Sequence, residues 1–458
     1  LRYFDIEFDE GAGFDDTDPR NAYGPYFQRQ RVEIYHTYAK SLVERGLAYP
    51  CFCTEEELDK VRAKQEEDKV LTGYYGEYAT CRNLSYEEIE ANIKAGKPYV
   101  LRLRSQGSPD KEITFVDAIK GEIKLPENIH DIVLLKKDGI PTYHFAHAID
   151  DHLMRTTTVV RGGEWLASAP IHYELFHLLG FKMPAYAHTA HLMKFDEETG
   201  GKRKLSKRKD PELSLDYYRK DGYHPYTMKV YLLTLLNSNF EEWHEKFPDK
   251  DINEFPFSVE KMNQSGALFD KDKLHNICKN ELSKLSEEEL YDFLYDWARE
   301  NEPENVEKWF GDREKMLQIL RLYMGVGAKR RRKDLMYAKQ IFELISYFFD
   351  GESAEEMDEF KLDEDMVSKI LKSYLAKYDH NDDNSVWFNK LKEIADEHGF
   401  ASDMKAYKAN PENFKGNVSD IAEAVRIAVT GRANTPDLWT IVHIMGEEQM
   451  TERIKKHI

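Results

Sequence analysis

The sequence lacks long apolar runs and is poor in cysteine. No stretch approaches the roughly 20 apolar residues that a membrane-spanning helix needs, so we expect no association with a membrane. The first residues include acids and no apolar core, unlike a secretory signal peptide. Only 4 cysteines occur among 458 residues, too few for a disulfide scaffold of this size. We therefore expect a reduced, cytoplasmic protein.

The chain also has no excess of positive charge. Its 65 basic and 84 acidic side chains give a formal net charge of -19, which argues against a general nucleic-acid-binding protein. Two basic clusters, residues 202–209 and 329–333, interrupt this acidic background. Such clusters can contact phosphates while acids elsewhere suppress nonspecific binding. For the second cluster, a solvated helix end is an equally good interpretation.

The pattern of apolar residues divides the chain into an α/β part and a helical part. Residues 132–135, 157–160 and 186–192 are predicted strands, and 166–179 is a predicted helix. This alternation favours a parallel sheet, whose ligand crevice lies at the carboxyl ends of its strands. Beyond Pro225 the strand patterns nearly vanish. Helices are predicted at residues 226–236, 287–298, 316–324, 336–349, 366–378, 386–398, 418–428 and 438–445.

Residues 51–125 have a pattern of their own, which looks like an insertion between two parts of a larger fold. The elements predicted around and within it are helices at 26–46, 55–68 and 86–95, a strand at 99–103, and a hairpin formed by 113–116 and 122–125. A chain of 458 residues is also too long for one core, so we expect three or more domains.

The most informative motif is Lys204-Leu205-Ser206-Lys207-Arg208. It lies between Gly200-Gly201 and the helix-breaking pair Asp210-Pro211, so it is expected to form a mobile loop. Two lysines around one small hydroxyl suit a polyphosphate, because the ammonium groups neutralise it while Ser206 and backbone N–H groups donate hydrogen bonds. On charge alone, solvated surface is the commoner interpretation of such a run.

The order of these residues resembles the KMSKS signature of class I aminoacyl-tRNA synthetases, and its context is similar to that of the bacterial glutamyl-tRNA synthetases. The resemblance covers essentially the whole chain and is densest between Pro141 and Arg208. There it includes Pro-Thr-Tyr-His-Phe-Ala at 141–146, Asp150-Asp151-His152, and Val-Arg-Gly-Gly-Glu-Trp at 160–165. The helical C-terminal half disfavours the glutaminyl enzymes, which use β-barrels there.

The resemblance implies an α/β plus all-α fold of five parts. These are 1–50, part of a Rossmann-type parallel-sheet catalytic domain that is incomplete at its N-terminus; 51–127, an inserted acceptor-binding domain; 128–212, the rest of the catalytic domain; 213–324, a helical linking domain that contacts the tRNA stem; and 325–458, an α-helical anticodon-binding domain.

It also implies ATP-dependent ligation of L-glutamate to tRNA(Glu), through a glutamyl-adenylate and with the help of Mg²⁺. Little acid–base chemistry is required, so positioning and charge stabilisation should dominate. The implied catalytic residues are Lys204, Ser206 and Lys207; those that bind ATP are Leu192, Lys204, Lys207 and Arg208. We expect the protein to act as a monomer.

For the amino acid, the resemblance implies a pocket around Arg161. A guanidinium after a β-branched strand can bind a carboxylate through two parallel hydrogen bonds, and the family uses the matching arginine on glutamate. Tyr143, His147 and Glu164 are assigned to the same pocket. From the bare sequence, a structural salt bridge for Arg161 and a core position for Tyr143 are the blander interpretations. Asp150-Asp151-His152 is expected to form a structural turn at the pocket rather than a metal site.

Cys51, Cys53 and Cys81 are a candidate zinc site. Three thiolates need a fourth ligand for closed tetrahedral coordination. Some relatives supply a histidine two residues after the last cysteine, but Asn83 stands there. Tyr75 or Tyr78 could complete the site, as a tyrosine does in part of the family, and Tyr75 is assigned to it. The alternative is three reduced cysteines without metal.

The family's other signature, the ATP-binding HIGH motif, does not occur in a matching place. His443-Ile444-Met445-Gly446 is a chance look-alike, because it ends a predicted helix. We therefore expect the chain to begin inside the nucleotide-binding domain and to be inactive by itself. One rival interpretation is a catalytically inactive tRNA-binding fragment or pseudoenzyme. A tRNA-modifying paralogue is a second rival, and residues 325–458 count against it because that paralogue lacks a helical C-terminal half.

Overall fold

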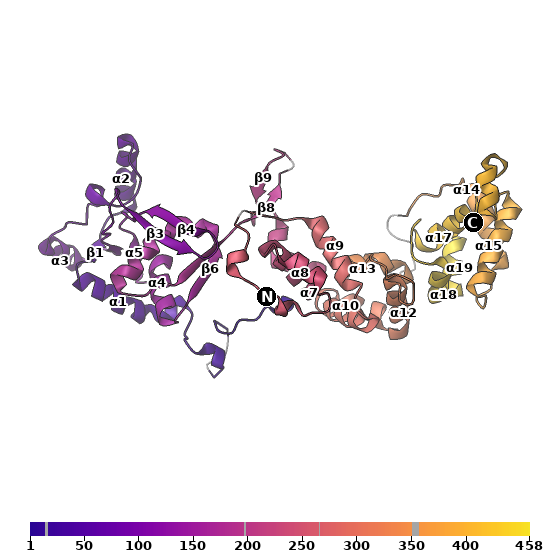
Figure 1. Ribbon diagram of the computed structural model, residues 1–458, viewed down its shortest axis with the longest axis horizontal. Coiled ribbons are helices and arrows are strands. Elements are labelled where there is room, and N and C mark those ends of the chain that lie inside the picture. The colour runs from indigo at the N-terminus through magenta and orange to yellow at the C-terminus, as the bar shows by residue number, and fades with distance from the viewer. Residues whose placement is uncertain (14–16, 197, 265, 350–356) are drawn as a thin grey trace. The chain divides into compact units, whose positions relative to one another are not determined.

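The computed structural model describes residues 1–13, 17–196, 198–264, 266–349 and 357–458 (Figure 1). The chain divides into two compact units. The sheet unit contains Ile6–Leu205 and Leu233–Phe269. The helical unit contains Leu1–Asp5, Ser206–Leu232 and Asp270–Ile458.

A four-stranded mixed sheet lies at the centre of the sheet unit. Its strands, in the order β4-β3-β7-β6, are β4 (Gly121–Pro126), β3 (Glu112–Asp117), β7 (Ala185–Thr189) and β6 (Thr158–Gly162). The pair β6–β7 and the pair β3–β7 are parallel, while β3 and β4 form an antiparallel hairpin. The hairpin was predicted, and its turn suits Gly121, whose φ of 78° is open to glycine but strained for other residues.

A second sheet is antiparallel and shares its core with three helices. Its strands, in the order β1-β2-β5, are β1 (Ala48–Cys51), β2 (Val100–Leu103) and β5 (Val133–Leu135). The helices are α1 (Val32–Glu44), α4 (Tyr143–Leu153) and α5 (Ala169–Leu179). Tyr35, Leu42, Phe145, Ile149 and Phe176 are almost completely buried in this core. The predicted helix at 26–46 starts later, because Gln28–Arg31 is a 3₁₀ turn.

Two further predictions in this unit are corrected by the structure. Asp150-Asp151-His152 lies inside α4 and does not form a turn. Its structural role is real, however, because the Asp150 carboxylate accepts hydrogen bonds from Arg31 Nε at 2.9 Å and from the Tyr35 hydroxyl at 2.7 Å. The predicted helix at 166–179 begins only at Ala169, after the 3₁₀ segment Gly163–Ser168 (η5).

The predicted strand 186–192 is also interrupted, since β7 ends at Thr189. A separate sheet follows, in the order β10-β8-β9, and its strands are β8 (Leu192–Phe195), β9 (Lys202–Lys204) and β10 (Ala267–Leu268). Strands β8 and β9 are antiparallel, with Met193 opposite Lys204. The lysine motif therefore starts at the end of a β-hairpin.

The helical unit contains the helices that the sequence predicts, with small shifts of their ends. They are α7 (Pro225–Leu236, which ends in the sheet unit), α10 (Glu287–Asn301), α12 (Arg313–Met324), α13 (Ala338–Ile345), α14 (Glu364–Lys377), α15 (Asn384–His398), α17 (Val418–Thr430) and α18 (Leu438–Met445). Two further helices, α9 (Lys271–Leu282) and α19 (Glu447–Lys455), were not predicted. The predicted helix at 336–349 is shorter, because Ser346–Phe348 is a 3₁₀ turn. His443–Gly446 ends α18, as expected for a chance look-alike. Among the described residues, no helix is both long and apolar enough to cross a membrane.

Candidate active site

Arg161 lies near the carboxyl end of β6, where a parallel sheet offers its ligand crevice. In the register of β6 and β7 its partner is His188. Side chains two residues apart share one face of a strand, so His188 and Tyr186 of β7 lie on the same side. The Arg161 guanidinium is 4.6 Å from the centre of the Tyr186 ring. The strands thus place one cation over an aromatic face and beside an imidazole.

The guanidinium of Arg161 is held by neutral acceptors. Its Nε donates to His188 Nε2 at 3.0 Å, and Nη1 donates to His172 Nδ1 of α5 at 3.1 Å. A longer contact of 3.4 Å joins Nη2 to the carbonyl oxygen of Trp165. A second imidazole lies behind the first, because His172 Nε2 is 2.9 Å from His144 Nδ1 of α4. None of these partners is a carboxylate.

Asp117, the last residue of β3, supports His188 from the other side. Its side chain and that of His188 are both fully buried. Asp117 Oδ2 accepts from His188 Nδ1 at 2.6 Å, while Oδ1 accepts from the backbone N–H groups of Ile119 and Lys120 at 3.0 and 2.9 Å. Burial by itself would raise the pKa of the Asp117 carboxyl, but the hydrogen bonds from His188 and these two N–H groups lower it overall. The carboxylate is therefore charged.

The histidines of this network are held in their neutral form. Burial lowers the pKa of His172 to about 2, helped by the nearby His147 and Arg161. Burial also lowers the pKa of His144, and the nearby His147 and Arg161 lower it further. For His188, burial outweighs the opposing hydrogen bond to Asp117, so its pKa is lowered too. A neutral imidazole has one nitrogen without a proton, and this nitrogen can accept a hydrogen bond from Arg161.

These lowered pKa values predict acid sensitivity. An unfolded histidine titrates near about pH 6.5, so below that pH the unfolded chain takes up a proton that buried His172 refuses. The free energy of unfolding should therefore fall as the pH drops from about 6.5 towards 2. His172→Asn should make this fall shallower, by up to about 1.4 kcal/mol per pH unit, in urea unfolding at neutral and mildly acidic pH. The exposed His177, also on α5, offers the matched variant His177→Asn for comparison. Equal slopes for His172→Asn and the unmutated chain would show that His172 titrates normally.

Tyr143 and His147 form a wall next to Arg161 and lie one turn apart on α4. Tyr143 remains 45% exposed, so its ring is available to a ligand. Its ring centre is 4.5 Å from that of Trp165, and its plane is nearly parallel to His147 at 5.6 Å. His147 is buried, with Nε2 2.8 Å from the Tyr186 hydroxyl and Nδ1 against the Asp151 carboxylate. The structure thus brings Tyr143, His147 and Arg161 together, as the sequence analysis expected.

Glu164 occupies a different part of the same neighbourhood. Its carboxylate is 3.3 Å from His191 Nδ1 and 3.9 Å from Lys204 Nζ, and its side chain is about half exposed. An acidic group there would repel a ligand carboxylate and attract an ammonium group. The distance between Glu164 and Lys204 also shows that Lys204, at the end of β9, lies within reach of this side of the pocket.

The lysine motif is anchored by its apolar residue. Leu205 is 2% exposed, and its N–H donates to the carbonyl oxygen of Leu192 at 3.0 Å. Ser206 begins a tight turn in which its N–H donates to buried Asp210 at 2.8 Å. Lys207 and Arg208 lie on this turn and are exposed. The motif therefore fixes its ends and presents two cations to solvent.

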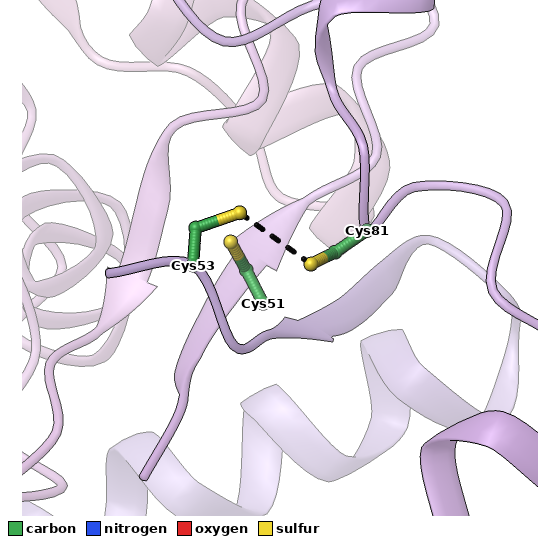
Figure 2. A group of neighbouring side chains, drawn as sticks. All are labelled: Cys51, Cys53 and Cys81. Carbon is green, nitrogen blue, oxygen red and sulfur yellow. Dashed lines mark hydrogen bonds between the residues drawn. The ribbon is translucent and has the colours of Figure 1, made fainter. Parts of the chain in front are cut away.

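The three cysteines of the candidate metal site converge, as Figure 2 shows. Their sulfur atoms lie within 4.8 Å of one another, and Cys53 Sγ is 3.6 Å from Cys81 Sγ. The hydroxyl beside them belongs to Tyr74, at 3.4 Å from Cys51 Sγ and 3.3 Å from Cys53 Sγ. Tyr75 and Tyr78, the two tyrosines considered from the sequence, point elsewhere: the hydroxyl of Tyr75 donates to the Leu71 carbonyl and that of Tyr78 to Asp68.

This donor set fits a zinc ion. Tetrahedral coordination with Zn–S bonds of about 2.3 Å separates the sulfurs by about 3.8 Å, close to the distance between Cys53 and Cys81. Hydrogen bonds with Cys53 and Cys81 lower the pKa of the Cys51 thiol strongly, whereas those with Cys51 and Cys53 raise the pKa of Cys81. A bound cation would hold the coordinating thiols deprotonated. Among the described residues, Cys51, Cys53 and Cys81 form the group of at least three possible metal ligands whose donor atoms lie close together.

Several residues of the site were not found from the sequence, namely Asp117, His144, His172, His188 and Tyr74. A signal existed for the histidines, since 7 of the 16 in the chain lie between His144 and His191. Their meeting depends on the register of β6 with β7 and on the placing of α4 and α5, which local patterns do not specify.

Comparison with known proteins identifies the family. The model of the catalytic domain of class I tRNA synthetases (E and Q) matches residues 2–276, and that of an anticodon binding domain matches residues 289–458. The glutamate–tRNA ligase of Acetivibrio thermocellus is 52% identical over 458 residues, covering 100% of this chain and 83% of its own. The chain belongs to the glutamate–tRNA ligase family. Its predicted class I catalytic domain and helical anticodon-binding region are confirmed.

More distant members of the family agree. The glutamate–tRNA ligase of Clostridium perfringens strain SM101 is 46% identical over 463 residues, covering 100% of this chain and 83% of its own. Among solved structures, a glutamate tRNA ligase from Elizabethkingia meningosepticum in complex with its amino acid has a TM-score of 0.71. It is 26% identical, and the match covers 96% of this chain and 86% of that one.

Proposed function

We propose that the protein activates L-glutamate with ATP and transfers the glutamyl group to tRNA(Glu). This proposal rests on Arg161, which lies half-buried at the carboxyl end of a parallel strand. The imidazoles that accept hydrogen bonds from its guanidinium are neutral. Such a cation favours an anionic ligand, and the exposed ring of Tyr143 lies against His172, a hydrogen-bond partner of Arg161. Because the chain belongs to the glutamate–tRNA ligase family, we take this anion to be glutamate.

Activation requires the α-carboxylate of glutamate to attack the α-phosphate of ATP, so that carboxylate must stay free. Arg161 therefore holds the side-chain carboxylate, with Tyr143 and His147 lining the pocket. Glu164 is suited to the ammonium group of the substrate. The attack expels pyrophosphate, and the glutamyl group then passes from the adenylate to a terminal ribose hydroxyl of the tRNA.

The phosphates are assigned to the lysine motif. Lys204, Lys207 and Arg208 supply positive charge as negative charge grows on the transferred and leaving phosphates, and Ser206 donates a hydrogen bond. Leu192 lies at the base of the motif, where its carbonyl accepts from Leu205. Mg²⁺, when bound with ATP, neutralises further phosphate charge.

Aminoacylation tests the proposal. The protein should form glutamyl-tRNA from glutamate, ATP, Mg²⁺ and tRNA(Glu), and glutamate should support ATP–pyrophosphate exchange better than aspartate or glutamine. Binding of tRNA(Glu) without any glutamate-dependent exchange would instead support a tRNA-binding protein without catalysis. We also propose that the protein works in the cytoplasm. We propose further that it is a monomer, and size-exclusion chromatography would test its oligomeric state.

We propose in addition that Cys51, Cys53 and Cys81 bind one Zn²⁺ with Tyr74 as the fourth ligand. The support is the convergence of three sulfurs and one hydroxyl, of which Cys51, Cys81 and Tyr74 are buried. A closed set of four protein ligands is typical of a structural zinc site. The ion would tie the end of β1 to the segment around residue 81 and take no part in the ligation chemistry.

Elemental analysis should find close to one zinc per chain, and Cys53→Ser should lose it. Tyr74→Phe should weaken retention against a chelator, whereas Tyr75→Phe should not, because its hydroxyl is turned to the Leu71 carbonyl at 2.6 Å. Cys278→Ala is the matched control, since this cysteine is buried in the helical unit next to Thr227. Protein free of metal and equally stable to heat would show that the thiols are simply reduced.

A further inference from the structure

We infer that His188, His172 and the buried Asp117 are positioning residues that aim the guanidinium of Arg161 at the glutamate side chain. None of the three is assigned to contact glutamate; they act through Arg161. The inference deepens the proposed function and rests on it, because it concerns the same pocket.

The hydrogen bonds of the network fix the position of every proton. Arginine can only donate, so His188 Nε2 and His172 Nδ1 must both be bare. His188 therefore carries its proton on Nδ1, where Asp117 accepts it. His172 carries its proton on Nε2 and donates it to His144 Nδ1. One consistent set of tautomers thus satisfies all of these contacts.

This arrangement selects which N–H groups of Arg161 face the ligand. A guanidinium has five N–H groups. His188 takes the one on Nε, His172 takes one on Nη1, and the carbonyl of Trp165 takes one on Nη2. One N–H is left on each of Nη1 and Nη2, and N–H groups on these two nitrogens can bind a carboxylate through two parallel hydrogen bonds.

Imidazoles suit this task better than carboxylates would. A direct carboxylate partner would orient Arg161 equally well, but it would also neutralise the charge that the ligand needs. Neutral nitrogens orient the guanidinium and leave its charge available. Asp117 is kept one imidazole away, and its own charge is shared with the backbone N–H groups of Ile119 and Lys120. It fixes the His188 tautomer without touching Arg161.

The network can be tested with variants that keep or remove one acceptor. The amide oxygen of asparagine can replace His172 Nδ1, and that of glutamine can replace His188 Nε2, whereas leucine replaces neither. In equilibrium dialysis, His172→Leu and His188→Leu should bind glutamate at least about tenfold more weakly. His172→Asn and His188→Gln should stay within about threefold of the unmutated chain. The exposed His177 of α5 supplies the control His177→Leu, which should bind normally.

A second measurement needs no loss of binding. In ¹⁵N-histidine-labelled protein, NMR should show His188 protonated on Nδ1 and His172 on Nε2, with each signal assigned by its disappearance in the variants. Asp117→Asn would present an N–H₂ group to His188 and should shift it towards the other tautomer. The opposite tautomers in the unmutated protein would overturn the inference even if every leucine variant failed to fold.

The outcomes separate this inference from the function on which it rests. If the unmutated chain binds glutamate no better than aspartate or glutamine, the proposed function fails. If it binds glutamate selectively and the leucine variants, with melting temperatures matching the amide variants, bind equally well, the function stands and the positioning role is wrong.

Discussion

Replacing Lys207 by alanine is expected to slow glutamyl-adenylate formation by roughly 30- to 1000-fold. Lys207 is exposed on the turn that follows β9, directly after the anchored residues Leu205 and Ser206. In the proposed role this lysine would meet phosphate charge that grows as the adenylate forms, and losing such a contact costs about 2–4 kcal/mol in the transition state. Glutamate-dependent ATP–pyrophosphate exchange measures this step.

The neighbouring lysine provides the control. Lys209→Ala removes the same charge two residues further along the same exposed turn, so it should change the exchange rate little if position rather than net charge matters. Binding of tRNA(Glu) should be almost equal in both variants. Unchanged pyrophosphate exchange in Lys207→Ala would rule out the proposed role of Lys207.

The elements with local signals were the ones that could be predicted. Helices such as α10 and α15 have side-chain N-caps at Ser286 and Asp383 and periodic apolar faces, and their predicted ends differ from the structure by only a few residues. The hairpin of β3 and β4 has alternating apolar residues and a glycine turn. In each case the residues that determine the element lie within one segment of the chain. Local propensity and the pattern of buried residues therefore favour the same secondary structure.

Asp150-Asp151-His152 shows where this reasoning fails. Aspartates are common in turns, yet these residues lie in α4. Arg31 and Tyr35 from other elements bind Asp150, and His147, one turn earlier on α4 itself, contacts Asp151. The spacing of Tyr143, His147 and Asp151, four residues apart each time, was the available sign of a helix. The turn was predicted from the family resemblance and not from this spacing, which was the better guide.

The sequence could bring together only those residues of the candidate site that stand in local motifs. Arg161 and Tyr143 stand in a recognisable local motif, and the structure places them together. His172 and His188 lie 16 residues apart and meet only because α5 returns the chain to the strand next to β6. The same holds for the tyrosine beside the cysteines, since adjacent residues such as Tyr74 and Tyr75 cannot be told apart until the backbone between Gly73 and Gly76 is known.

Arg161→Ala should have the largest effect on the choice of amino acid. The side-chain carboxylate of glutamate would lose its doubly hydrogen-bonded cationic partner, which costs about 2–4 kcal/mol or roughly 30- to 1000-fold in glutamate affinity. The KM for ATP should hardly change, because Arg161 is assigned to the amino acid alone. Pyrophosphate exchange measured against each substrate in turn gives both values.

Arg161→Lys refines this test. Lysine keeps the charge but has no planar fork, and it cannot donate at once to His188, His172 and a carboxylate with the geometry of a guanidinium. It should therefore recover only part of the lost affinity, and discrimination against glutamine should recover more than affinity, since a positive charge still prefers an anion. An equal loss for glutamate and ATP in both variants would indicate damage to the whole pocket. Full recovery by lysine would mean that charge alone selects glutamate, and that the orientation set by the two imidazoles is not needed.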